Sequence, residues 1–332
     1  MSSSPSSIAV IGELNVDLIA SGLPSAPVLG RELLAEDFRT VLGSASAIFA
    51  CGVARLGRPV SFFSNVGRDE FGRFCLQELR KAGISTKHVQ VAGTTKTGVT
   101  ISLSTRSDRA LVTVLGAISR LRYSDLDIEA LRGHCHLHMT SYFLQTRLRD
   151  SFPRVLREAK MLGLTTSFDP NSDPLSSWSR DIWDVLEEAT ILFVNKEEAL
   201  RLTRKNKVPA ALDHLAERVP CVVIKLGAKG AIAAMGGQVI VVPAFKISPV
   251  DTTGAGDSFA AGFVHAYLRE KGLQQCLIEA NACGALCAMQ VGGTTGQPSL
   301  AQLSRFLSRN RMKATQSSFR STSLAPRSGG QR

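Results

Sequence analysis

The sequence predicts an α/β fold, a three-layer sandwich with helices on both faces of a central, mostly parallel sheet and with a small β-sheet lid. Apolar runs of strand length alternate with helical segments along most of the 332 residues. Segments 97–103 and 110–115 break this rhythm, because they alternate like antiparallel strands around a polar turn. The apolar content of 44% and the charged content of 20% are those of an ordinary globular protein.

The predicted elements follow in chain order. The first part contains strands at 7–12 and 60–64 and helices at 45–56 and 67–82, while residues 20–40 are hard to assign. Next come helices near 124–132, 147–162, 179–188 and 209–218, a short helix from 196, and strands at 135–139, 164–168, 190–194 and 221–226. A hairpin at 231–242 turns at a Gly-Gly pair, and helices near 256–271, 274–289 and 299–309 close the fold. We expect one domain over 8–309, with the lid taken from parts of 14–40 and 94–118.

Location and redox state follow from the composition. The sequence contains no uninterrupted run of about 18 apolar residues, so no membrane-spanning helix is predicted. The Ser-rich start is not a secretory signal, and we therefore expect a cytoplasmic protein. The seven cysteines are odd in number and form no Cys-x-x-Cys, which indicates reduced core thiols.

The net charge of +11 raises the question of nucleic-acid binding. Six basic residues and no acidic one lie in 309–332, which leaves +5 for the rest. Residues 310–332 and 1–7 are predicted to be disordered, and no element shows a basic, aromatic-interleaved face. The charge distribution therefore disfavours nucleic-acid binding. If the basic tail did bind RNA or DNA, that affinity would be lost on truncation at Asn310.

The most informative stretch is 251–259, Asp-Thr-Thr-Gly-Ala-Gly-Asp-Ser-Phe, which leads into an apolar helix. Gly254 and Gly256 let the backbone approach a ligand, and a helix start attracts anions such as phosphate. Asp257 in this place is either a helix cap or a base that deprotonates an alcohol. The spacing alone leaves both interpretations open.

Several other predicted strands are followed by polar or Gly-rich loops at the same edge of the sheet. Asn15 and Asp17 follow the first strand, Asp169 a later one, and Asn195 the next; each alone is explained as an edge, a turn or a cap. Lys225 and the Gly-rich loop after it end another strand. Ligands of open α/β sheets bind at this edge. A P-loop is excluded by its missing motif, and no Gly-x-Gly-x-x-Gly follows the first strand.

Together these features resemble the ribokinase-like (PfkB-type) carbohydrate kinases, from about Ile8 to Leu307. Residues 251–259 look like the C-terminal signature of that family without a change. Segment 43–57 followed by 66–72 is similar to its N-terminal signature, and Gly116-Ala117 matches the small pair after its lid strands.

The resemblance implies roles for individual residues. Asp257 would be the catalytic base, and Gly254, Ala255 and Gly256 would form the anion hole for the γ-phosphate. The implied sugar site consists of Asn15, Asp17, Gly43 and Ser44. The implied nucleotide site consists of Asn195, Lys225, Gly227, Gly230 and Asn281. Glu198 would hold Mg²⁺ through water, and Asp251 and Thr253 would begin a loop that binds a monovalent cation such as K⁺ in some members.

Two departures from the family pattern concern the ligands. Ser44 and Ile48 stand where the N-terminal signature usually has Gly and Asn, so the sugar pocket should differ from that of ribokinase. Lys225 stands where many members have Thr, which would add a positive charge near the phosphates.

The resemblance implies an ATP- and Mg²⁺-dependent sugar kinase that forms a homodimer through its lid. A nucleoside kinase and a catalytically silent sugar or nucleotide sensor are the alternatives. The intact Asp257 and Gly-rich helix start argue against the sensor.

Overall fold

A nine-stranded sheet forms the centre of the computed structural model, which describes residues 7–105 and 108–310. The strand order is β13-β12-β11-β10-β9-β8-β1-β4-β5. The strands are β1 (Ser7–Ile11), β4 (Val60–Gly67), β5 (Ser85–Ala92), β8 (His134–Thr140), β9 (Thr165–Asp169), β10 (Ile191–Asn195), β11 (Cys221–Lys225), β12 (Ala231–Met235) and β13 (Gln238–Val242). Only β12 runs against its neighbours. The predicted mostly parallel sheet is confirmed.

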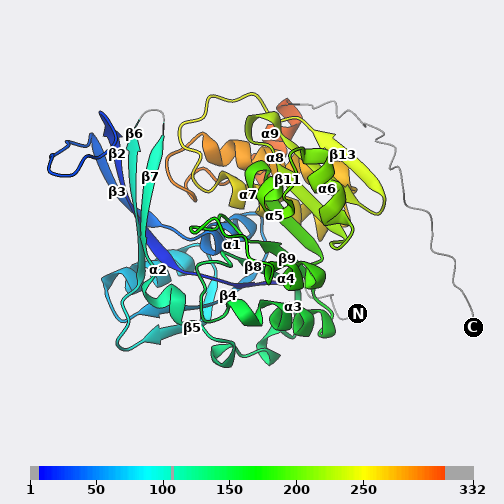
Figure 1. Cartoon of the computed structure of the whole chain (residues 1–332), viewed down its shortest axis with the longest axis horizontal. Coiled ribbons are helices and arrows are strands. Elements are labelled where there is room, and N and C mark those ends of the chain that lie inside the picture. Colours follow the sequence, from blue (N-terminus) through cyan, green and yellow to red (C-terminus); the bar gives the residue numbers. More distant parts are fainter. Residues whose placement is uncertain (1–6, 106–107, 311–332) are drawn as a thin grey trace, which may run out of the picture.

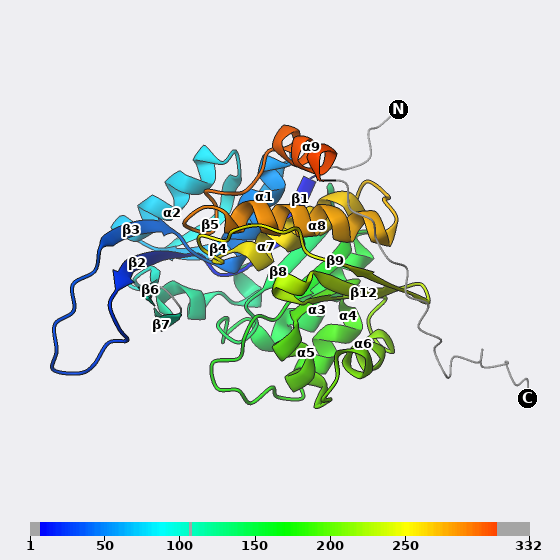
Figure 2. The same ribbon diagram turned by 90° about the horizontal axis from the view of Figure 1, so that it is seen from above.

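Helices cover both faces of this sheet (Figures 1 and 2). One layer contains α1 (Ala45–Arg55), α2 (Glu70–Lys81), α7 (Ala255–Tyr267) and α8 (Leu273–Ala288), with α9 (Leu300–Arg309) outside α8. The other layer contains α3 (Phe152–Met161), α4 (Ile182–Glu188), α5 (Lys196–Thr203) and α6 (Val208–Ala216). Alternate strand residues enter two cores: Val10 belongs to the first and Ile11 to the second. Burial on both faces explains why the strands are apolar runs.

A second sheet of four strands stands at one side of the sandwich (Figure 1). Its order is β3-β2-β6-β7, from β2 (Asn15–Leu23), β3 (Asp37–Leu42), β6 (Gly98–Thr105) and β7 (Arg109–Val114). The strands predicted at 97–103 and 110–115 pair in antiparallel fashion, as expected. The small separate sheet is therefore confirmed, and the unassigned stretch 20–40 contributes part of it.

The structure corrects some elements. Segment 124–132 is not one helix but two 3₁₀ turns, Tyr123–Asp125 and Glu129–Leu131. There Asp125 and Asp127 accept bonds from nearby backbone N–H groups, which competes with a continuing helix. Strand β5 was missed because its residues are mostly polar and half-exposed at the sheet edge. The helices expected from 147 and 179 begin at 152 and 182.

Some predictions fall on residues that the structure does not describe. The disorder predicted at 1–7 and 310–332 falls almost entirely outside the described residues, and so do residues 106–107 of the turn predicted between the lid strands. Among the described helices, none has the length and apolar character that crossing a membrane requires. All seven cysteines are free, and six of them are buried, as predicted.

Candidate active site

The start of α7 is built to receive an anion. Gly254 is the N-cap residue with φ of 70°, and a Cβ atom there would lie 2.6 Å from the Cα atom of Gly293. Glycine therefore fits both the backbone angle and the space. The Ala255 N–H donates to the Thr252 carbonyl at 3.2 Å, whereas the Gly256 N–H has no acceptor among the described residues. The helix dipole adds partial positive charge at this point.

Asp257 lies in the first turn of α7 and does not cap the helix, since Gly254 occupies the cap position. Among the described residues, no hydrogen bond reaches its carboxylate. Burial raises the pKa of Asp257 to about 8, Lys225 opposes this rise, and the carboxylates of Asp169 and Glu13 add to it. A carboxyl group with such a pKa suits proton transfer near neutral pH.

A cavity of about 870 Å³ opens beside Asp257, and it is called the acceptor cavity below because the predicted sugar-binding residues lie around it. The start of α1, the ends of β8 and β9, and the inner face of the lid enclose it. Polar residues from these elements, from neighbouring loops and from the start of α7 line it, among them Glu13, Asn15, Asp17, Ser44, Thr100, Ser102, Arg109, Ser141, Arg149, Asn171, Asp173 and Asp257. Ile48 lies on the same wall, so the departure noted in the sequence bears directly on this cavity.

The predicted sugar-binding residues are brought together at this cavity. The Asn15 Nδ2 atom donates to Asp17 Oδ1 at 2.9 Å, and burial raises the pKa of Asp17 to about 6. Gly43 does not line the cavity but clears room, because a Cβ atom there would lie 2.0 Å from Asp17 Oδ1. Ser44 caps α1 by accepting from the Ala47 N–H, and its hydroxyl donates to the Glu13 carbonyl.

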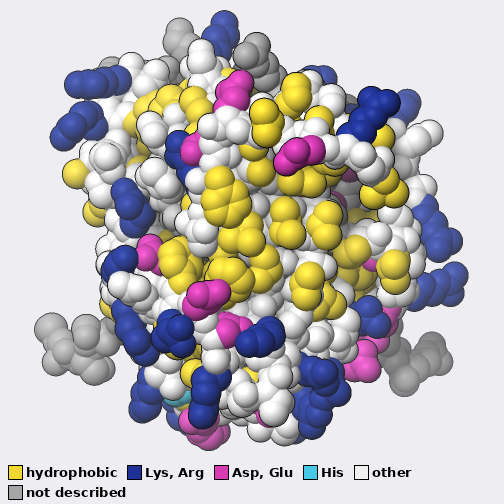
Figure 3. Space-filling model, turned by 90° about the vertical axis from the view of Figure 1, so that its left-hand side faces the viewer, with side chains coloured by type: hydrophobic (Ala, Val, Ile, Leu, Met, Phe, Trp, Pro, Cys, Tyr) yellow, Lys and Arg dark blue, Asp and Glu magenta, His cyan; other side chains and the backbone are white. Residues whose placement is uncertain are grey.

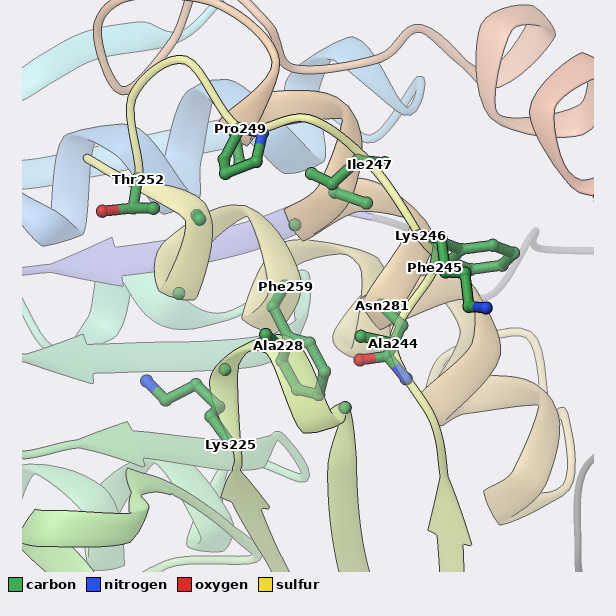
Figure 4. Close-up of a pocket in the computed structure, with 17 residues that line it drawn as sticks. Lys225, Ala228, Ala244, Phe245, Lys246, Ile247, Pro249, Thr252, Phe259 and Asn281 are labelled. Carbon is green, nitrogen blue, oxygen red and sulfur yellow. The ribbon is translucent and has the colours of Figure 1, made fainter.

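A second cavity, of about 490 Å³, lies on the other side of the α7 start (Figure 4) and is called the nucleotide cavity below, after the predicted residues that line it. Four of the predicted nucleotide residues line it: Lys225, Gly227, Gly230 and Asn281. Phe259 from α7 and Phe245 supply flat apolar walls. The Asn281 Nδ2 atom donates to the carbonyls of Val242 and Pro243, which fixes this side chain against the opposite wall.

Lys225 lines the second cavity and lies beside the start of α7. Its Nζ atom is 2.6 Å from Asp169 Oδ2, and the two side chains are 15% and 2% exposed. A Cβ atom on Gly256 would be 3.4 Å from this Nζ atom, so the lysine lies beside the anion site. Burial lowers the pKa of Lys225, but Asp169 and Glu198 outweigh burial and hold the pKa above its usual range. Lys225 therefore carries its charge at the anion site.

Asn195 and Glu198 form a capping box at the start of α5. Asn195 Oδ1 accepts from the Glu198 N–H at 2.9 Å, and Glu198 Oε2 accepts from the Asn195 N–H at 2.7 Å. Neither residue lines the two cavities. Burial and the nearby Asp169 carboxylate raise the pKa of Glu198. The structure thus shows the capping role and places a second carboxylate beside Asp169.

The loop before α7 is closed by Asp251. Its Oδ1 atom accepts from the N–H and hydroxyl of Thr253, and its Oδ2 atom accepts from the Gly292 N–H. Arg109 reaches this loop from the lid strand β7: it donates to Thr253 Oγ1, and its Nη1 atom is 3.8 Å from Asp251 Oδ1. Sequence reasoning missed Arg109, because a basic residue beside a polar turn carries no sign of the loop that it contacts.

Two cavities border one Gly-rich helix start, and one of them contains a buried carboxylate, as expected for a phosphotransferase that acts on an alcohol. The comparisons name the family. The model of the pfkB family of carbohydrate kinases matches residues 5–300. The chain belongs to the pfkB family of carbohydrate kinases, and its relatives are sugar kinases.

Two relatives and one solved structure illustrate the similarity. A 2-dehydro-3-deoxygluconokinase of Bacillus subtilis is 31% identical over 288 residues, 82% of this chain and 89% of its own. An uncharacterized sugar kinase of Archaeoglobus fulgidus is 29% identical over 249 residues, 74% of this chain and 98% of its own. A provisionally named ribokinase II from E. coli, solved with ATP and Mg²⁺, superposes with a TM-score of 0.83 at 26% identity, covering 92% of this chain and 100% of its own. The predicted ribokinase-like fold is confirmed.

Proposed function

We propose that this chain transfers the γ-phosphate of ATP to a hydroxyl group of a sugar, with Asp257 as the base and the start of α7 as the anion hole. One observation carries the proposal. A single helical turn borders both cavities, with Gly254 and Asp257 on the acceptor side and Ala255 and Gly256 on the nucleotide side. A phosphoryl group held by this turn would be shared between donor and acceptor.

The chemistry follows from this placement. Asp257 takes the proton of the acceptor hydroxyl while the hydroxyl oxygen forms a bond to the γ-phosphorus. The bond between that phosphorus and the β–γ bridging oxygen breaks, and ADP leaves. The Gly256 N–H, the helix dipole and the Lys225 ammonium group stabilise the charge on the phosphoryl oxygens. The lid, with Asn15 and Asp17 on its inner strand, holds the acceptor and excludes water.

The carboxylates that would hold a magnesium ion lie beside Lys225, which lines the nucleotide cavity, although they do not line it themselves. Asp169 and Glu198 place two carboxylates next to each other, and one lysine does not neutralise both. Carboxylate oxygens, often acting through water, suit Mg²⁺. When bound, Mg²⁺ would neutralise charge on the β- and γ-phosphates. ATP and Mg²⁺ in the E. coli ribokinase II structure support this part of the proposal.

A monovalent cation has less support in the side chains. The Asp251 carboxylate already accepts three hydrogen bonds, and the Arg109 guanidinium group lies 3.8 Å from it. Asp251 and Thr253 thus hold their loop closed without an added ion, and no step of the mechanism is routed through K⁺.

The acceptor is tested with a panel of sugars, sugar acids and nucleosides scored by ADP release in the presence of Mg²⁺. We expect turnover above the background ATPase rate with at least one sugar or sugar acid. Turnover with nucleosides alone would make the protein a nucleoside kinase. Ligand binding without turnover on any acceptor would favour the sensor and contradict the proposal.

The outer face of the lid supports the proposed homodimer. Four large apolar side chains of this face are exposed: Phe38, Ile101, Val112 and Val114. Figure 3, which views the molecule from the side where this sheet stands, shows hydrophobic side chains gathered on the surface. The sheet alternation turns their neighbours Thr100, Leu111 and Thr113 into the acceptor cavity. A second copy offers a matching apolar face, and a two-fold axis pairs each patch with itself.

The double change Ile101→Glu and Val112→Glu is expected to convert the dimer to a monomer, because two facing lids would bury four unpaired carboxylates. Sedimentation equilibrium measures the mass. Leu300→Glu, at an exposed leucine on α9, is the control and should leave the dimer intact. A wild-type protein that is monomeric at micromolar concentration would contradict this part of the proposal.

A further inference from the structure

A third cavity, of about 370 Å³, lies between α1, α8 and α9. It shares no lining residue with the acceptor or nucleotide cavities. Figure 2 shows α9 alongside α8 in the outer part of the layer that also contains α1. Its lining comes from the end of α1, the end of α8, the loop 289–298 and one face of α9. The proposed kinase reaction makes no use of this cavity.

Three arginines line this cavity, and no acidic residue does. Arg55 is the last residue of α1, Arg309 is the last residue of α9, and Arg305 lies one turn before Arg309. Within residues 7–105 and 108–310, no carboxylate lies within 4.0 Å of these three guanidinium groups, and none of the groups donates a hydrogen bond. Neither α1 nor α9 contains an acidic residue that could neutralise them. Three positive charges around one hollow favour an anion with several oxygens.

The cavity also has a buried polar wall. Gln297 lines it and is 1% exposed. Its Nε2 atom donates to the Ile48 carbonyl at 2.7 Å and to Ser258 Oγ at 3.0 Å, which fixes the amide. Its Oε1 atom is buried and has no partner among the described residues. Because this oxygen does not open onto the cavity, Gln297 shapes and rigidifies the wall, and the three arginines are the groups that face an anion.

The remaining lining is both polar and apolar. Gln290, Thr295 and Gln302 offer further hydrogen-bonding groups, while Met289, Pro298 and Phe306 are apolar. We propose that this cavity is a binding site for a phosphate-class anion, either inorganic phosphate or a phosphate monoester, held by Arg55, Arg305 and Arg309. Guanidinium groups bind the phosphate oxygens in pairs, and the volume admits a small molecule but not a nucleotide chain.

Calorimetric titration of the full chain with inorganic phosphate tests this site. A non-hydrolysable ATP analogue and Mg²⁺ are present at saturation, so that the anion hole at α7 is filled. We expect one phosphate to bind per chain. The affinity should fall about tenfold or more in the triple variant Arg55→Gln/Arg305→Gln/Arg309→Gln, since the loss of even one charge-assisted hydrogen bond lowers affinity by about that factor. Arg73→Gln, at an exposed arginine on α2, should bind phosphate like the wild type.

The outcomes separate the alternatives. Absence of binding to the wild type, or equal affinity in the triple variant, would overturn the proposal. If the triple variant does not fold, Arg305→Gln alone is measured, because its side chain is exposed and its loss should not affect folding. Tighter binding of phenyl phosphate than of phosphate would assign the site to a monoester, and the reverse to free phosphate. Preferential binding of a short RNA, lost in the same variant, would overturn the small-ligand proposal.

The result does not depend on the proposed kinase activity. The titration is repeated with the Asp257→Asn variant, which lacks the proposed base. Phosphate should bind that variant with unchanged affinity, whether or not the wild type phosphorylates a sugar. Loss of phosphate binding on changing Asp257 would instead locate the anion at the α7 start and overturn the separate site.

Discussion

Replacing Asp257 with asparagine is expected to lower turnover by about 10²- to 10⁴-fold, the usual contribution of a general base. The amide keeps the size and shape of the side chain but cannot take the proton of the acceptor hydroxyl. ATP binding should persist, because Lys225, Gly227 and Asn281 line the nucleotide cavity and Asp257 does not. ADP release gives the rate, and calorimetry with a non-hydrolysable ATP analogue gives the affinity.

The melting temperature of Asp257→Asn should not fall, because burial already disfavours the charged form of this carboxyl group. Asp184→Asn, at an exposed aspartate on α4, is the matched control and should turn over at the wild-type rate. Full turnover by Asp257→Asn would remove Asp257 from the role of base.

Replacing Lys225 with methionine is expected to lower both stability and turnover. The change leaves Asp169 buried without its partner at 2.6 Å, and breaking a buried ion pair in this way typically costs about 3–5 kcal/mol. It also removes a positive charge from beside the anion site. Urea unfolding measures the free energy, and ADP release at saturating ATP measures the rate.

The same variant should change the pH dependence. The base acts in its ionised form, and the pKa of Asp257 is about 8. The wild-type kcat/KM should therefore rise about tenfold per pH unit below pH 8 and level off above it. Lys225 lowers the pKa of Asp257, so the rising limb in Lys225→Met should lie at higher pH.

Two further variants separate charge from shape at this position. Lys225→Arg keeps the positive charge, so the rising limb of kcat/KM should lie at the wild-type pH. Lys229→Met changes an exposed lysine of the same loop and should leave the pH profile unchanged. A limb at the same pH in wild type and Lys225→Met would contradict the coupling between Lys225 and Asp257.

Much of the fold could be predicted from local pattern. Strands buried on both faces, such as β10 and β11, are apolar runs between helices, and this signal needs no tertiary information. Strand β5 lacked it, since an edge strand is held by pairing with β4 and not by burial of its own side chains. The pattern of residues 124–132 predicts a helix, but Asp125 and Asp127 accept hydrogen bonds from nearby backbone N–H groups and favour short turns instead.

The candidate site was predictable to the extent that its residues lie in short motifs. Gly254, Ala255, Gly256 and Asp257 are consecutive, so their joint position at one helix start follows from the sequence. The roles assigned to them stay predictions until the variants are measured. For Asn195 and Glu198 the sequence left capping and metal placement open, and the structure shows the capping box.

The sequence by itself determined most of the order of strands and helices and the joint position of residues 254–257 at one helix start, because both depend on neighbouring residues. Only the tertiary structure decided what surrounds that turn. It placed Lys225 on Asp169, brought Arg109 from the lid to Asp251, and grouped Arg55 with Arg305 and Arg309 around a separate cavity. Lys225 is 56 positions from Asp169, and Arg55 is 250 positions from Arg305. A local pattern does not show which distant side chains the packing brings together.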